Sequence, residues 1–245
     1  MEAEHELALT ALFNNYLAGP ANSFLNALGI TVENPKHPWS NWLVMEIFVV
    51  VLIMLVVALV RGRLSAENPG KLQQVFELIY EFIVSTINEV GVVHGERFVY
   101  YIGTIFIFIL SMNLIGIIPG LDAPTNYIPV TVGLAVVTFV YYNMVGFKDH
   151  GFGYLKQFMG PVAWLAWFMI PIEVISHFVR PLSLSVRLYG NMFAGEKVTG
   201  VFLSMTFLII PVIFMLLHIF VALVQTYVFT LLTTIYIGGA TSDEH

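Results

Sequence analysis

The chain has 245 residues, of which 58% are hydrophobic and only 11% are charged, and its mean hydropathy is +0.83. An average soluble domain carries roughly 25% charged residues, and a soluble fold of this length cannot bury so much apolar surface. The composition therefore excludes a soluble globular protein and a disordered chain, and leaves the lipid bilayer as the solvent. The net charge of −6 gives no reason to expect a nucleic-acid partner. The absence of cysteine excludes disulfides and thiolate metal sites.

Five segments are long and apolar enough to cross a bilayer as helices, which takes about 20 residues each. They cover residues 42–60, 98–118, 128–147, 161–194 and 199–238. The last two are each longer than about 30 residues, so they fit within about 30 Å of hydrocarbon only when strongly tilted. We therefore expect an all-α polytopic membrane protein. Residues 42–245 would form its single membrane domain, and residues 1–41 an N-terminal segment on the outer side.

Residues 71–90 show a different pattern. Apolar side chains recur there at spacings of one, three and four, while Glu77, Glu81 and Ser85 lie on the opposite face. This pattern predicts an amphipathic helix that lies in the membrane interface or packs on other helices, rather than a sixth span.

Basic residues in the connecting segments predict the orientation of the chain. They are Arg61, Arg63, Lys71, Arg97, Lys148 and Lys156. The segment before the first span has only Lys36, and the connection between the second and third spans has no basic residue. Because basic loops stay on the cytoplasmic side, we expect the N-terminus outside and the C-terminus in the cytoplasm.

A polar stripe interrupts the fourth span. Its members follow one another at spacings of 4, 3, 4, 3 and 4, which places them on one face of a helix: Glu173, His177, Arg180, Leu184, Arg187 and Asn191. Ser183 lies one turn before Arg187 and borders the same face.

Arg187 is the most informative member of the stripe. An arginine near the centre of a bilayer costs from about 2.5 to over 10 kcal/mol, and a guanidinium cannot deprotonate to avoid that cost. It must therefore face water, a carboxylate or both. Neither Glu173 nor Glu196 is spaced to pair with it across one helical turn, so we expect the partner on another helix or another subunit.

The fifth span carries a second polar set. His218 and Gln225 are seven residues apart on one face, and Glu196 approaches His218 if the last two spans form a hairpin. A carboxylate beside an imidazole is a candidate proton relay. Any single polar residue could instead make a structural interhelical hydrogen bond, worth about 0.6 kcal/mol on average. For His177 we favour that structural role, and for Gln225 and Arg180 the two interpretations have similar weight.

The chain lacks the motifs of a self-contained enzyme. It has no Walker A loop for ATP and no H-E-x-x-H pair for zinc, and its histidines are widely dispersed. We therefore expect no enzymatic activity by itself, no catalytic residue, no cofactor and no metal.

The run PLSLSVRLYGNMFAGEK at 181–197 closely resembles the signature of the subunit a family of rotary F-type ATP synthases. The segments HIFVALVQTYVFTLLTTIY at 218–236 and FILSMNLIGIIPG at 108–120 also resemble parts of that family. The resemblance covers most of the chain from about residue 40, including the number and order of the predicted helices.

This resemblance implies a stator subunit in the bacterial cytoplasmic (inner) membrane, where lipid, a rotating c-ring and the b subunits of the peripheral stalk are its partners. Arg187 would face the ring carboxylate, favour its ionised form and block leakage between two half-channels. The resemblance places four residues in the outer half-channel: Asn191, Glu196, His218 and Gln225. It places Glu173 and Ser183 near the opposite access path. Arg180 stands at a position that is lysine in some relatives.

The connection between the second and third spans departs from the family. Tyr127 stands where relatives often carry an acidic residue, and Pro129 where they often carry a polar one, so the resemblance leaves an outer half-channel role for this loop open. The alternative functions are a self-contained secondary transporter, the proton pathway of another membrane complex, and a structural scaffold. A secondary transporter would be expected to show inverted repeats, and none stands out.

Overall fold

The computed structural model describes residues 7–27, 37–62, 64–65, 67–118, 120–151, 153–154, 166–205 and 209–242. Within these ranges the chain is helical and contains no strand, which confirms the predicted all-α class. The α-helices are α1 (Ala8–Ala27), α2 (Asn41–Arg61), α3 (Lys71–Val90), α4 (Val99–Ile115), α5 (Ile128–His150), α6 (Ala166–Met205) and α7 (Ile209–Thr241). Two short 3-10 helices are η1 (Gly95–Phe98) and η2 (Pro124–Asn126).

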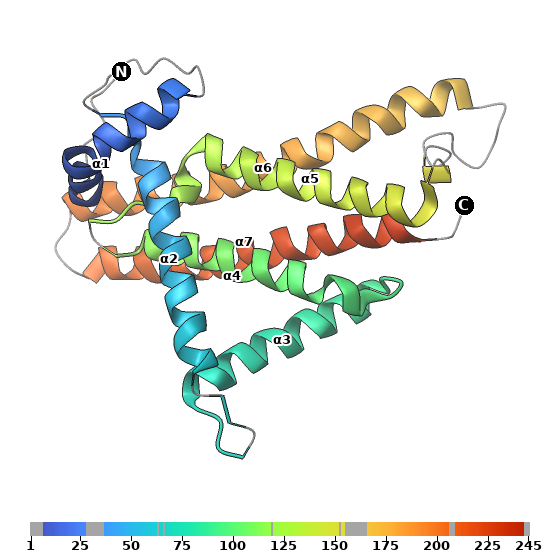
Figure 1. Cartoon of the computed structure of the whole chain (residues 1–245), viewed down its shortest axis with the longest axis horizontal. Helices are drawn as coiled ribbons and strands as arrows, with labels where there is room; N and C mark the ends of the chain where they lie inside the picture. The colour runs from blue at the N-terminus through green and yellow to red at the C-terminus, as the bar shows by residue number, and fades with distance from the viewer. Residues whose placement is uncertain are drawn as a thin grey trace.

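Five of these helices are long and apolar enough to cross a membrane: α2, α4 together with η1, α5, α6 and α7. The helices α4 to α7 run side by side, and α2 crosses their direction (Figure 1). With 40 residues, α6 is about 60 Å long, twice the thickness of the hydrocarbon, so it fits only at a steep tilt.

The connection between the last two spans lies later in the chain than the sequence analysis placed it. Helix α6 runs on to Met205 and α7 begins at Ile209, so the predicted break at 195–198 is wrong. Glu196 and Lys197, which fall in the predicted break, lie within α6. A charged residue is tolerated inside a membrane helix when it faces other protein, and Glu196 is half-buried there. Residues 161–165, where we expected the fourth span to begin, are outside the described ranges.

Helix α1 was not predicted. Its Asn14 amide accepts a hydrogen bond from the Trp39 amide (3.0 Å) and donates one to the Trp39 carbonyl (3.3 Å). The Asn41 side chain likewise accepts a bond from the Leu7 amide at 3.3 Å. These contacts attach α1 to the start of α2, at the same end of the molecule as the last turn of α6 and the first turn of α7, whereas α7 ends at the opposite end (Figure 1).

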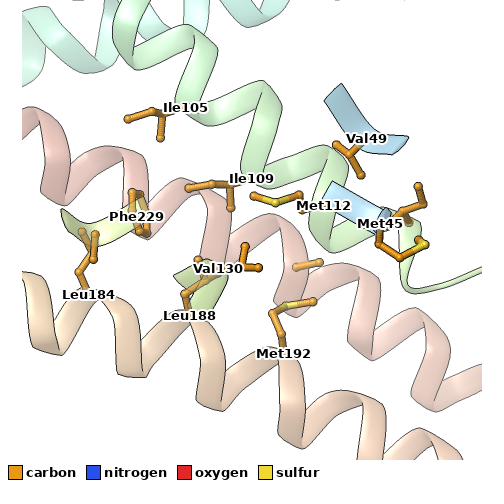
Figure 2. Close-up of a cluster of buried hydrophobic side chains, with 13 residues drawn as sticks. Met45, Val49, Ile105, Ile109, Met112, Val130, Leu184, Leu188, Met192 and Phe229 are labelled. Carbon is orange, nitrogen blue, oxygen red and sulfur yellow. The ribbon is translucent and has the colours of Figure 1, made fainter. Parts of the chain in front are cut away.

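Two clusters of buried apolar side chains hold the helices together. Figure 2 shows the first, in which Leu184, Leu188 and Met192 of α6 pack toward side chains from α2, α4, α5 and α7. The second lies around Ile83 and Ile87 of α3 and joins α3 to α4, α5 and α7. Helix α3 covers the range expected for the amphipathic helix, and it buries Ile83 and Ile87 while Leu72 remains exposed.

Candidate functional site

Arg187 lies on the outward side of α6. The side chains on either side of it along the helix, Leu184 and Leu188, are fully buried in the first cluster and fix the rotation of the helix (Figure 2). Arg187 is therefore exposed, and among the described residues it makes no hydrogen bond or ion pair. The location of its partner, on another helix or another subunit, therefore stays a prediction.

The predicted polar stripe does not face one direction along its whole length. His177 and Leu184 point into the protein, Glu173 and Arg180 are partly exposed, and Arg187 is exposed. A stripe with a strict seven-residue repeat drifts around a helix of 3.6 residues per turn. The stripe therefore follows the border between the packed and the free side of α6.

Four of the predicted site residues lie on α6 and α7, on the side of Arg187 toward the connection of these two helices. We call Asn191, Glu196, His218 and Gln225 the turn-side cluster. The Asn191 amide donates a hydrogen bond of 2.7 Å to the Oε1 atom of Gln225. Gln225 is only 2% exposed, and its own Nε2 atom has no hydrogen-bond partner among the described residues.

His218 packs against α6 at Gly195, the residue before Glu196. A Cβ atom placed on Gly195 would lie 2.7 Å from Nδ1 of His218, so the imidazole occupies the space that the missing side chain of Gly195 leaves free. The ring is buried, and its Nε2 atom has no hydrogen-bond partner within the described part of the chain. The expected approach of His218 to the region of Glu196 is therefore present.

Asp122 joins this region from the connection between α4 and α5, and the sequence analysis did not assign it a role. The Tyr127 phenol donates a hydrogen bond to Oδ2 of Asp122 at 3.1 Å, and η2, which begins two residues after Asp122, packs against α6. The loop therefore brings a carboxylate near the turn-side cluster, although Tyr127 itself is not acidic. The signal in the sequence was that Asp122 is the single charge in a long apolar stretch.

Asn113 holds the same connection to α7 through a fully buried network. Its amide donates to the Thr226 hydroxyl at 3.1 Å and to the Ala222 carbonyl at 3.4 Å, and its Oδ1 atom accepts a bond of 2.8 Å from Thr125. All these polar groups are satisfied, so this network positions helices rather than offering a free binding group.

A second polar group lies at the opposite end of α6. We call Glu173, Arg180, His177, Asn143 and Tyr154 the far-end cluster. Arg180 donates a hydrogen bond of 3.3 Å to Oε1 of Glu173, and its guanidinium lies 5.5 Å from the centre of the Tyr236 ring. Ser183, which we expected nearby, is exposed one turn before Arg187 and lies between the two clusters.

His177 has the structural environment that we favoured for it. Its Nε2 atom lies 2.9 Å from Oδ1 of Asn143, and the same oxygen accepts a hydrogen bond of 3.2 Å from the Tyr154 phenol. The sequence analysis missed Asn143 and Tyr154. Asn143 was detectable as an isolated amide in an apolar span, but nothing in the sequence indicated that Tyr154 folds back onto it.

No group of three or more histidine or acidic side chains that could hold a metal ion occurs among the described residues. The site consists of carboxylates, amides, imidazoles and one unpaired guanidinium along two long apolar helices. These groups exchange or orient protons and bind water.

Comparison with known proteins identifies the family. Residues 43–238 match the family described as ATP synthase A chain. The chain is 48% identical over 235 residues to ATP synthase subunit a of Solibacter usitatus (strain Ellin6076), which covers 96% of this chain and 100% of the relative. It is 46% identical over 243 residues to ATP synthase subunit a of Koribacter versatilis (strain Ellin345), with 98% and 99% covered. The chain therefore belongs to the bacterial branch of the ATP synthase A chain family, the subunit a family of F-type ATP synthases.

Proposed function

We propose that this protein is the ion-translocating stator of its ATP synthase, in which Arg187 separates two half-channels and faces an ionisable carboxylate on a rotating c-ring. The exposed, unpaired guanidinium of Arg187 carries this proposal. A permanent charge on an apolar helix surface needs a partner, and the described part of the chain provides none. A carboxylate on a neighbouring subunit meets this need.

The two clusters lie on opposite sides of Arg187, as two separate access paths require. Along α6, Glu173 precedes Arg187 by about 21 Å and Glu196 follows it by about 14 Å, at about 1.5 Å per residue. In the proposal, the turn-side cluster forms the outer half-channel and the far-end cluster forms the inner access path. An ion reaches the ring through one path and leaves through the other, and Arg187 blocks direct passage between them.

The orientation and the partners belong to the same proposal. Arg97 of η1 pairs with Asp149 near the end of α5 at 3.1 Å, so the basic segments at Arg97 and Lys148 lie together. Under the positive-inside rule this end faces the bacterial cytoplasm, and the N-terminus with α1 lies outside. The c-ring and the b subunits of the peripheral stalk are the protein partners, and lipid covers the remaining apolar surface.

The test is Arg187→Ala in the intact complex, assayed in everted membrane vesicles by ATP-driven proton uptake. We expect loss of uptake, because without the fixed charge the ring carboxylate is not ionised as it passes and protons leak between the paths. Arg61→Ala, which changes an exposed arginine at the end of α2, is the matched control and should pump normally. Proton uptake at the native rate by Arg187→Ala complexes would refute the proposal.

A further inference from the structure

A small cavity lies at the far end of α6, between α5, α6 and α7. Its volume is about 20 Å³, which is room for about one water molecule. The polar side chains that line it include Glu173, His177 and Arg180 of α6, and Tyr142 and Tyr154 add their rings. Gly239 and Ala240 of α7 form part of the opposite wall.

Tyr154 closes part of this cavity although it does not belong to a membrane helix. It follows α5, whose C-terminal end lies at the same end of the molecule as that of α7 (Figure 1), and a residue in such a connecting segment normally lies in water. Tyr154 is instead only 4% exposed. Its side chain must therefore turn back between the helices.

Gly146 of α5 creates the space for the Tyr154 ring. A Cβ atom on Gly146 would lie 2.5 Å from Cε2 and 2.8 Å from Cδ2 of Tyr154. These distances are too short for any side chain, so a residue larger than glycine would displace the ring. The Tyr154 ring also contacts the ring of Phe147, with the ring centres 5.0 Å apart.

Asn143 holds the phenol group in one orientation. Its Nδ2 atom donates to the Phe139 carbonyl at 2.7 Å, which fixes Oδ1 as the acceptor for the Tyr154 hydroxyl at 3.2 Å. The same Oδ1 atom then accepts from Nε2 of His177 at 2.9 Å, so the imidazole carries its proton on Nε2. Burial also raises the pKa of the Tyr154 phenol above its ordinary value, which keeps this group a donor.

We propose that Tyr154, seated on Gly146 and bonded to Asn143, is the constriction that separates the cavity beside Glu173 and Arg180 from the aqueous phase. The inference rests on the proposed function, because it gives that function's inner access path its narrowest point. Tyr154 acts by position. Its ring limits the width of the path, and His177 positions the amide that holds it.

The experiment measures access to the cavity directly and uses the natural absence of cysteine in this chain. Ala240→Cys places a thiol in the cavity wall, where Ala240 is 4% exposed. The reagent is 2-aminoethyl methanethiosulfonate, added to everted and to right-side-out vesicles that contain the intact complex. We expect Tyr154→Ala to raise the labelling rate in everted vesicles by about tenfold or more, since a buried thiol otherwise reacts only after local opening.

Two further variants keep the test independent of any folding defect in Tyr154→Ala. Gly146→Ala leaves Tyr154 intact but displaces its ring, and it should also accelerate labelling. Tyr154→Phe keeps the ring on Gly146 and should change the rate less than either. Tyr100→Ala, at a tyrosine that is 82% exposed on α4, is the control and should have no effect.

The outcomes separate this inference from the proposed function. If the thiol of Ala240→Cys is labelled at the same rate with native Tyr154, with Tyr154→Ala and with Gly146→Ala, Tyr154 is not the constriction. This conclusion does not depend on the effect of Arg187→Ala on proton uptake. Acceleration confined to right-side-out vesicles would support the constriction and overturn the proposed orientation.

Discussion

The turn-side and far-end clusters lie on the same pair of helices but differ in how far the chain satisfies their polar groups. In the turn-side cluster, Nε2 of His218 and Nε2 of Gln225 are buried without a hydrogen-bond partner among the described residues, and no ion pair to Glu196 occurs there. In the far-end cluster, Glu173 is paired with Arg180 and Asn143 bonds both His177 and Tyr154.

Under the proposed function, this difference fits different tasks for the two ends. Buried polar atoms without protein partners favour bound water or a mobile proton, so the turn-side cluster is suited to carrying the ion. A cluster whose bonds are satisfied is rigid, so the far-end cluster is suited to setting the geometry of a path. Substitutions in the turn-side cluster should therefore reduce transport more than those at the far end.

Glu196→Leu should have the largest effect among the cluster residues. Removing the carboxylate eliminates the acidic proton-binding group of the turn-side cluster, and positioned proton-transfer groups are typically worth about a hundredfold or more. ATP-driven proton uptake in vesicles measures the loss. Glu67→Leu, at an exposed acidic residue outside the helices, is the control. Retention of most of the native rate in Glu196→Leu would show that the turn-side cluster does not carry the ion.

Gly195→Ala should have the next largest effect, through packing. The new methyl group would lie 2.7 Å from the His218 ring, and such overpacking typically costs about 1–3 kcal/mol. The thermal inactivation temperature of the purified complex should fall. Gly200→Ala is the matched control, because a Cβ there meets nothing within 4 Å. Equal inactivation temperatures for the two variants would contradict the close packing of His218 on α6.

Gln225→Leu should have a smaller effect on stability together with a loss of transport. The substitution removes the acceptor of the 2.7 Å hydrogen bond from the Asn191 side chain, which leaves the Asn191 amide without this partner. An unsatisfied polar group costs about 1–3 kcal/mol when it is buried. The cost is smaller here, because Asn191 is exposed. The double variant with Asn191→Leu should lose less than the sum of the single changes, since both remove the same bond. Strict additivity of the inactivation temperatures would mean that the bond contributes nothing.

Arg180→Ala should have the smallest effect. Both partners of the Glu173–Arg180 pair are about one-third exposed, and pairs of this kind are worth about 0–1 kcal/mol. We expect nearly native stability and a change in proton uptake of a few fold at most. A loss as large as that of Glu196→Leu would eliminate the contrast between the two clusters.

The local sequence pattern was sufficient for the spans and the amphipathic helix, because each depends on the periodicity of its own residues. It failed at 195–198, where a break between two spans was predicted but α6 continues, because the packing that accommodates charged residues within a membrane helix is a tertiary effect. The expectation that Arg187 faces water or a carboxylate followed from the free-energy cost of placing its charge in a bilayer. The seat of Tyr154 on Gly146 and the pairing of Asp122 with Tyr127 could not be predicted, because both depend on how the connecting segments fold back.

Cross-linking in the intact complex tests the central claim, that the face of Arg187 meets the c-ring, most directly. Val186 is exposed next to Arg187, so Val186→Cys combined with a cysteine one helical turn from the ring carboxylate should form a disulfide between the two subunits under mild oxidation. Val57→Cys, at an exposed position on α2, should not. A disulfide at Val57→Cys but none at Val186→Cys would contradict the account.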